Sequence, residues 1–419
     1  MNTPPRNGPL KVLHTDDGLP VPFYVVPYGA DGACTAPDTL DDLVKTAADA
    51  TDVFVFAHGW NTDRTEAIAR YEALIARYAD ARHRWWNPVT RPYKPVLAGV
   101  FWPSTALVFG RELAAARAGG DGSDVSADVD ALAAVVNAPG RLRELAALDA
   151  LDEAAQRDLA GILAPALTAD DDELDDTPAT PEDLLAVWRA AHGRSGEGAA
   201  GLFLPDPRDL IRAATVLLMK DRAGRVGARG VAVMRRRLAE ASSGSRLHLI
   251  GHSYGAKVML SALCGGPAPV REVESVLLLQ PAISCLCFAA DADGHGRPGG
   301  YRRALERTRQ PVMTTYSSHD VPLTKLFQWA VRRPSDLGEE HVTGAPGPPS
   351  RYCALGGYGP YGTRAGEVSW VDALSPGHRY AVTTGGPRLL AIRGDRIITA
   401  HSDVTNPSTA WALLCQVIG

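Results

Sequence analysis

The tightest constraint on the fold lies at residues 246–264, where an apolar segment ends in a Gly-His-Ser-Tyr-Gly pentapeptide and a helix-like segment follows. A strand that turns this abruptly into a helix forces strained backbone angles on the central residue, Ser253. Side chains two positions before and after Ser253 would collide with the turn, and Gly251 and Gly255 remove those collisions. The sequence therefore predicts that Ser253 stands above the carboxyl edge of a sheet, at the start of a helix.

Apolar segments of strand length recur along the chain. The segment 52–57 is almost entirely apolar, as is usual for a strand that is buried on both faces of a parallel sheet. Strands are predicted at 11–14, 21–26, 52–57, 95–102, 247–250, 274–280, 311–316 and 389–398. The first two flank the turn sequence Asp16-Asp17-Gly18 and predict a hairpin. Alternation of the other strands with helical segments, such as 65–79, predicts an α/β fold with a mostly parallel sheet that helices cover on both faces.

Residues 105–225 interrupt this alternation. They contain helical segments at about 127–136, 141–151, 154–167, 181–191 and 207–219, and an acidic run at 170–176. We predict an α/β core in two parts, 1–104 and 226–419, with 105–225 as a helical insertion after the fourth strand. Such an insertion would cap the carboxyl edge of the sheet and exclude water from a site there. The alternative is a decoration at the side of the core, and the acidic run fits a solvated loop.

Composition excludes some classes of function. The net charge of −5 over 419 residues gives no electrostatic reason to expect nucleic acid as a partner, and no apolar stretch is long enough to span a bilayer. The first residues lack the pattern of a secretory signal, so we expect the protein in the cytoplasm. A stretch at 333–380 is rich in Gly, Pro and aromatic residues and predicts a long ordered loop. Without a C-x-x-C pair, the cysteines predict neither a zinc site nor a disulfide framework, and most should be reduced: Cys34, Cys264, Cys285, Cys287, Cys353 and Cys415.

A serine hydroxyl needs a base within hydrogen-bond reach and a third group that orients this base. Asp320 follows the predicted strand 311–316, and His401 follows the last predicted strand, so both would lie at the same sheet edge as Ser253. Asp291 and Asp293 compete with Asp320 as the acid, although their segment has the sequence of a turn and only faintly resembles a calcium loop. Two other histidines are weaker candidates for the base: His378, and His319, which could be a bystander beside Asp320.

Two backbone amides are candidates for stabilising a negatively charged oxygen. Tyr254 follows the serine at the start of a helix, and His58-Gly59-Trp60 follows the strand 52–57. Gly59 allows the backbone to approach the substrate, and the Trp60 amide would face the same point as the Tyr254 amide.

With these residues assembled, the chain resembles the α/β-hydrolase superfamily over about residues 10–104 and 226–419. The resemblance implies a serine hydrolase that acts on small-molecule esters or related acyl bonds, needs no cofactor or metal and forms an acyl-enzyme. Ser253 would attack, His401 would carry the proton and Asp320 would orient His401. The chain lacks the H-G-G-G oxyanion loop of one esterase branch. Acyl transfer by the same residues, and a non-catalytic binding module, remain alternatives because this fold hosts many functions.

Overall fold

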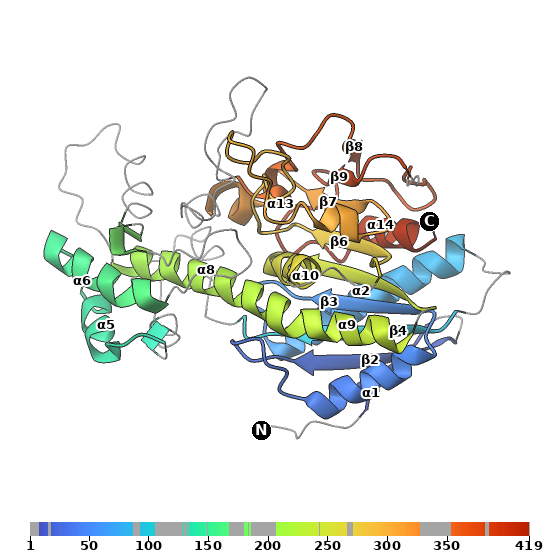
Figure 1. Cartoon of the computed structure of the whole chain (residues 1–419), viewed down its shortest axis with the longest axis horizontal. Coiled ribbons are helices and arrows are strands. Elements are labelled where there is room, and N and C mark those ends of the chain that lie inside the picture. Colours follow the sequence, from blue (N-terminus) through green and yellow to red (C-terminus); the bar gives the residue numbers. More distant parts are fainter. Residues whose placement is uncertain are drawn as a thin grey trace.

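The three-dimensional arrangement comes from a computed structural model of the chain (Figure 1). The structure describes residues 8–15, 18–86, 93–104, 129, 132–133, 135–148, 150–166, 180–182, 184–185, 207–242, 244–265, 271–326, 353–381 and 385–418.

These residues form one nine-stranded sheet with the strand order β1-β2-β4-β3-β5-β6-β7-β9-β8. The strands are β1 Lys11–His14, β2 Pro20–Pro27, β3 Asp52–Ala57, β4 Pro95–Phe101, β5 Arg246–His252, β6 Ser275–Leu279, β7 Val312–Tyr316, β8 Val368–Asp372 and β9 Leu389–Arg393. β1 pairs antiparallel with β2, and every other pair in the sheet is parallel. The α/β architecture with a mostly parallel sheet, predicted from the sequence, is confirmed.

All eight predicted strands are present, with two differences. β9 ends at Arg393, five residues early, because the chain turns at Gly394, whose carbonyl accepts hydrogen bonds from the amides of Ile397 and Ile398. The prediction of an irregular stretch at 333–380 is wrong for 368–372, which form the edge strand β8. β8 is only partly buried and carries no continuous apolar run, so it lacked the signal that identified the central strands.

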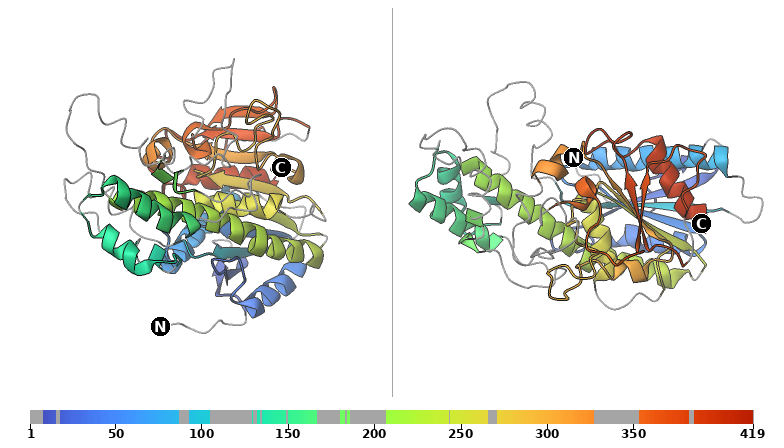
Figure 2. Two further views of the ribbon diagram at one scale, coloured as in Figure 1. Left: turned by 60° about the vertical axis from the view of Figure 1, so that its left-hand side comes forward. Right: turned by 90° about the horizontal axis from the view of Figure 1, so that it is seen from above.

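Helices cover both faces of the sheet (Figure 2). One face carries α1 Pro37–Ala48, α8 Pro207–Arg225, α9 Ala232–Ala241 and α10 Tyr254–Cys264, and the other carries α2 Arg64–Trp85 and α14 Pro407–Ile418. β3 serves both cores: Val53 and Val55 pack on the first face, and Phe54 and Phe56 on the second. Burial on both faces explains why β3 is apolar at consecutive positions.

The described part of the predicted insertion is helical. α5 Pro139–Ala146 and α6 Glu153–Leu163 lie near the start of α8, on the side toward which the sheet strands point (Figure 1). α8 continues through a π-helical turn, η2 Val226–Val231, into α9, so the predicted boundary at 225 falls inside a continuous helical segment. The acidic run and residues 105–128, 167–179 and 186–206 lie outside the described residues, and the cap remains a prediction.

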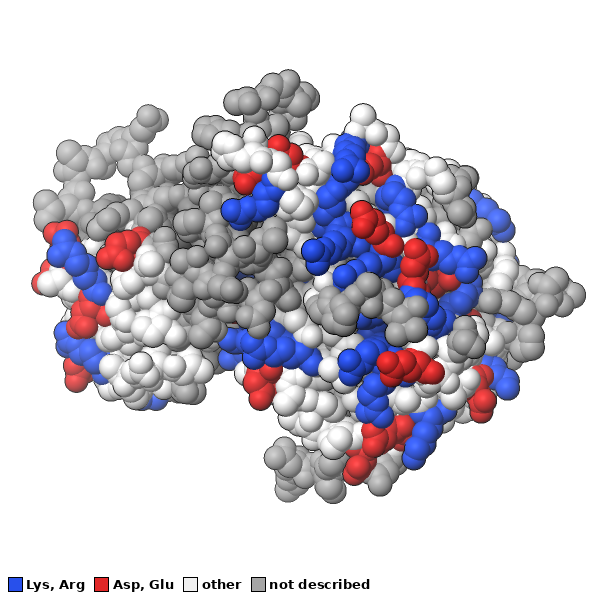
Figure 3. Space-filling model, in the orientation of Figure 1, with Lys and Arg blue, Asp and Glu red and all other residues white. Residues whose placement is uncertain are grey.

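Charges are mixed over the surface. On the face in Figure 3, basic and acidic side chains lie interspersed. Arg237, for example, pairs with Asp41 at 2.7 Å between α9 and α1. In the part of the chain that the structure describes, no helix is both long and apolar enough to cross a bilayer.

The structure corrects the expectation about cysteines at one pair. Cys285 and Cys353, which are 68 residues apart in sequence, form a disulfide, and both are fully buried. Cys34, Cys264, Cys287 and Cys415 are thiols that take no part in a disulfide. Sequence spacing alone could not reveal the pair, because its partners come from two loops that only the folded sheet brings together.

We expect four thiols to react with an aromatic disulfide reagent in denaturant before reduction, and all six afterwards. Reduction should lower the free energy of unfolding by about 2–5 kcal/mol, because the bond closes a long loop in the unfolded chain. The variant Cys353→Ser, which keeps five cysteines, should show five reactive thiols under both conditions. Six reactive thiols in the unreduced wild-type protein would contradict the disulfide.

Candidate active site

Ser253 lies at the sharp turn between β5 and α10. Its backbone angles are φ 56° and ψ −125°, a conformation that residues other than glycine adopt only at a cost. The turn also brings the start of α10 against β3: a Cβ atom on Gly255 would lie 2.1 Å from the carbonyl oxygen of Ala57. Glycine is therefore required at 255, and the strained turn predicted from the pentapeptide is present.

The structure brings Ser253, His401 and Asp320 together in one hydrogen-bonded row. Ser253 Oγ lies 2.8 Å from His401 Nε2, and His401 Nδ1 lies 2.8 Å from Asp320 Oδ2. A carboxylate accepts, so His401 Nδ1 carries the proton and Nε2 is left to accept the proton of the serine hydroxyl. Asp320 is fully buried, whereas the His401 side chain is 24% exposed, so the row runs from the interior to an accessible imidazole. This is the arrangement in which a histidine acts as a general base on a serine.

The loops that carry Asp320 and His401 are tied to each other. They follow β7 and β9, which pair in parallel, so both begin at the same edge of the sheet. Ser317 Oγ donates to the carbonyl of Ile398 at 2.8 Å, and the Ser318 amide donates to Asp395 Oδ1 at 2.8 Å. These cross-links fix the distance between the acid and the histidine.

The competing candidates lie elsewhere. His319 and His378 are exposed, and His378 contributes its carbonyl oxygen to the Trp411 indole N–H. Asp291 Oδ1 accepts from the amides of Gly294 and Gly296, and Asp293 Oδ1 accepts from the amides of His295 and Arg297. These two carboxylates shape a turn, as the sequence indicated, and His401 makes its hydrogen bond to Asp320.

The loop after β3 approaches Ser253 through Gly59. A Cβ atom on Gly59 would lie 2.7 Å from Ser253 Cβ, so only glycine fits here. His58 fixes the start of the loop: its Nε2 accepts from the Trp102 amide at 3.3 Å, and its Nδ1–H donates to the Gly59 carbonyl at 2.9 Å. Burial lowers the pKa of His58 to about 4, so it stays neutral and keeps this tautomer. Next in the chain, Trp60 lies with its ring 6.3 Å from that of Tyr254, the first residue of α10.

Sequence reasoning missed His252, the residue before the serine. Its Nε2 donates to the carbonyl oxygen of His401 at 2.9 Å, and Arg70 Nη1 lies 3.5 Å from its Nδ1. Burial lowers the pKa of His252 well below its usual value, so the ring stays neutral and keeps one donor and one acceptor. His252 therefore holds the main chain of His401, while Asp320 holds its ring.

No family model, curated protein or solved structure matches this chain. The residues that the structure describes contain no group of three or more His, Cys, Asp or Glu side chains that could hold a metal ion. The chemistry of the site is therefore read from its side chains.

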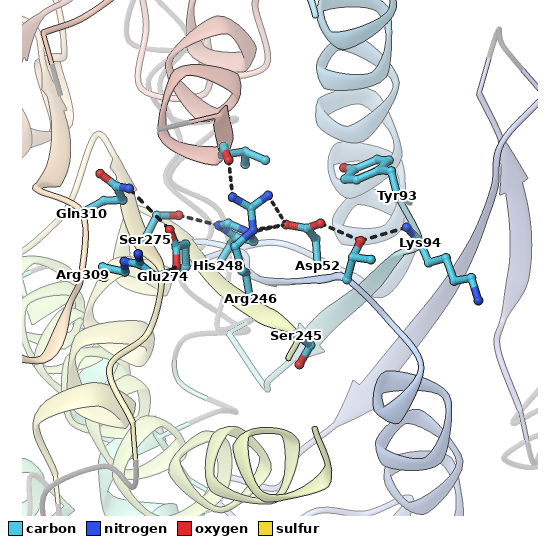
Figure 4. Close-up of polar contacts among 12 residues, drawn as sticks. Asp52, Tyr93, Lys94, Ser245, Arg246, His248, Glu274, Ser275, Arg309 and Gln310 are labelled. Atoms are coloured by element: carbon cyan, nitrogen blue, oxygen red, sulfur yellow. Dashed lines mark hydrogen bonds and ion pairs between the residues drawn. The ribbon is translucent and has the colours of Figure 1, made fainter. Parts of the chain in front are cut away.

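A second Ser-His-Asp row lies at the other edge of the sheet, where β3, β5 and β6 begin (Figure 4). His248 Nδ1 lies 2.8 Å from Ser275 Oγ, and His248 Nε2 lies 3.1 Å from Asp52 Oδ1. Arg246 also pairs with Asp52, at 2.6 Å. Ser275 is the first residue of the regular strand β6, whereas Ser253, which is also buried, stands at a strained turn. This second row is a buried polar network that joins three strands, and it provides an internal control for the first.

Proposed function

We propose that this chain is a serine hydrolase that cleaves a carboxylic ester, or a related acyl bond, through an acyl-enzyme intermediate. The observation that carries the proposal is the row from Ser253 through His401 to Asp320, with both hydrogen bonds at 2.8 Å and the serine at a strained turn. Strain of this kind persists in proteins mainly where function requires it.

In the proposed reaction the same groups act twice, first when the acyl-enzyme forms and again when water hydrolyses it. Ser253 Oγ forms a bond to the acyl carbon while His401 Nε2 takes the hydroxyl proton, and the proton then passes to the departing alcohol as the ester C–O bond breaks. Water repeats the cycle and releases the acid. Asp320 keeps His401 in the required tautomer and stabilises its charged form. The amides of Tyr254 and Trp60 are the proposed donors to the oxyanion, because Gly59 and the start of α10 both approach Ser253.

The order of these parts supports assignment to the α/β-hydrolase superfamily. In that fold the serine lies on a strand-to-helix turn, and serine, acid and histidine follow in chain order. The oxyanion donors come from the residue after the serine and from the loop after the third strand. Here Ser253 follows β5, Asp320 follows β7, His401 follows β9, and the Gly59 loop follows β3.

The disulfide bears on the proposed location. Cys285 and Cys353 are joined, and such bonds persist in oxidising compartments and are rare in the cytoplasm. This favours a compartment that oxidises thiols over the cytoplasm expected from the sequence.

A fluorophosphonate probe tests the proposal directly, since it bonds only to a serine that is activated by its surroundings. We expect stoichiometric labelling of the folded protein, with the modified peptide carrying Ser253. Ser275→Ala is the matched control and should be labelled like the wild type, because it leaves Ser253 and its hydrogen bond to His401 in place. A folded protein that resists labelling would contradict the proposal and favour the non-catalytic binding module.

A further inference from the structure

Gln280 follows β6 at the carboxyl edge of the sheet and has an unusual backbone conformation. Its φ is 45°, in the left-handed region that residues other than glycine adopt at a cost. The main-chain N–H donates to Thr315 Oγ1 on β7 at 2.9 Å and helps to hold that conformation. Strained residues of this kind cluster at functional sites, where the surrounding structure maintains them.

The side-chain amide of Gln280 is fully buried and donates to two acceptors. Nε2 lies 2.9 Å from Asp320 Oδ2 and 3.0 Å from the carbonyl oxygen of Gly356. Because both neighbours are acceptors, the NH₂ group rather than the oxygen of the amide faces them. Its oxygen, Oε1, is buried without a hydrogen-bond partner among the described residues, which is unfavourable. An apolar side chain would avoid this cost, so the position favours a donor to Asp320.

Asp320 is therefore held by more than the histidine it orients. Its Oδ2 accepts from both Gln280 and His401, and its Oδ1 accepts from the Leu323 amide at 3.1 Å. The donors on Gln280 and Leu323 fix the plane of the carboxylate independently of His401. Without Gln280 the carboxylate could rotate about its Cβ–Cγ bond, and its hold on the imidazole would weaken.

The second acceptor of Gln280 belongs to a segment that is itself tied down. Gly356 O also accepts from the Ser317 amide at 3.0 Å, at the start of the loop that carries Asp320. A Cβ atom on Gly356 would lie 2.5 Å from the main chain of Gln280, so the two backbones pack directly together. The disulfide between Cys285 and Cys353 anchors the start of this segment. Gln280 is thus held between the acid and a fixed carbonyl.

We propose that Gln280 is a positioning residue of the candidate active site, which fixes the Asp320 carboxylate toward His401 Nδ1. The effect on rate rests on the proposed hydrolase function. The effect on the Asp320–His401 hydrogen bond does not. Because Gln280 is buried, it acts through Asp320 rather than on substrate, and its loss lowers kcat while KM changes little.

The test compares Gln280→Met with Gln416→Met. Gln416 is an equally buried glutamine whose Nε2 donates to the carbonyls of Val276 and Pro311, outside the candidate site. Gln280→Met should lower kcat by about 10- to 100-fold with KM within about twofold, the size of effect typical when a residue that orients an active-site side chain is lost. Gln416→Met should lower thermal stability and leave kcat near that of the wild type.

Two readouts separate positioning from general destabilisation. The proton on His401 Nδ1 should give a downfield NMR signal that shifts or broadens in Gln280→Met and stays unchanged in Gln416→Met. In Gln280→Glu the new carboxyl group donates to Asp320 when protonated and repels it when ionised. The kcat of this variant should therefore fall as the pH rises through the titration of the carboxyl pair.

The Gln280 variants and the fluorophosphonate probe test different statements. A folded Gln280→Met variant with wild-type kcat and an unchanged proton signal overturns the inference. If Gln280→Met does not fold, the pH profile of Gln280→Glu decides, and a profile parallel to the wild type overturns it. A wild-type protein that resists the fluorophosphonate probe contradicts the proposed function instead, and the proton signal alone then decides the role of Gln280.

Discussion

Replacing Ser253 by alanine should lower kcat for hydrolysis of a short p-nitrophenyl ester by about 10⁵- to 10⁶-fold, since the acyl-enzyme can no longer form. The amides proposed as oxyanion donors remain, so a small rate above that of water should persist. Alanine removes the hydroxyl group that bonds to His401 Nε2 and leaves the turn intact. Steady-state rates of purified wild type and variant, matched by circular dichroism and thermal stability, measure the effect.

Ser275→Ala is the control for this measurement. Ser275 also bonds to a histidine at 2.8 Å, and that histidine also contacts an aspartate. Two features separate the rows: only Ser253 has a strained backbone, and the His401 side chain is 24% exposed whereas that of His248 is fully buried. We expect Ser275→Ala to lower stability and leave kcat within about threefold, as for a substitution outside a catalytic unit. A Ser253→Ala variant that retains the wild-type rate would show that the Ser253 row does not carry the chemistry.

The central sheet could be predicted because its strands are buried on both faces. Continuous apolar runs such as 52–57 have few other stable locations, and the helices between them dictate parallel pairing. The edge strand β8 gave no such signal. Its side chains alternate between partial burial and exposure, and Trp370 is 48% exposed. At an edge, burial no longer dictates the residue types, and the sequence pattern loses its information.

The proximity of the three residues of the candidate site could be predicted because each lies in the turn or loop that follows a parallel strand. Parallel strands gather their carboxyl ends at one edge, so chain order alone places Ser253, Asp320 and His401 near one another. Gln280 is the first residue after β6, but the sequence predicted it as the last residue of a strand at 274–280, and no motif distinguishes a glutamine there from a turn residue. The proposed role of Gln280 rests on its contact with Asp320, which lies 40 residues away in the sequence and is brought near only by the fold.

The contacts of His252 and of the disulfide were beyond sequence reasoning for a related reason. The bond from His252 Nε2 to the His401 carbonyl joins residues 149 positions apart, and the disulfide joins two loops 68 positions apart. Such pairs depend on loop conformations that no local propensity specifies. The strands thus set which residues share an edge of the sheet, while long-range contacts between loops set the distances at which those residues can react.

Replacing Asp320 by asparagine should lower kcat by about 10⁴-fold, as expected when the histidine of such a row is held in the wrong tautomer. All three groups that face the carboxylate are donors: His401 Nδ1–H, the Gln280 amide and the Leu323 main-chain N–H. Whichever way the asparagine side chain lies, its NH₂ group meets a donor. If it faces His401, Nδ1 has to accept, the proton moves to Nε2, and His401 can no longer take the proton of Ser253.

Asp291→Asn is the matched control, because Asp291 is the competing acid in the sequence and is exposed on a turn. Its Oδ1 accepts from two main-chain amides, and an asparagine oxygen can accept in the same way, so kcat should stay at the wild-type value. The pH dependence of kcat/KM, which reports the titration of the general base in the free enzyme, is a second measurement that separates Asp320 from Asp291 as the acid. If Asp320→Asn retained the wild-type rate while Asp291→Asn lost it, the acid of the site would be Asp291, and the Asp320–His401 hydrogen bond would serve only the structure.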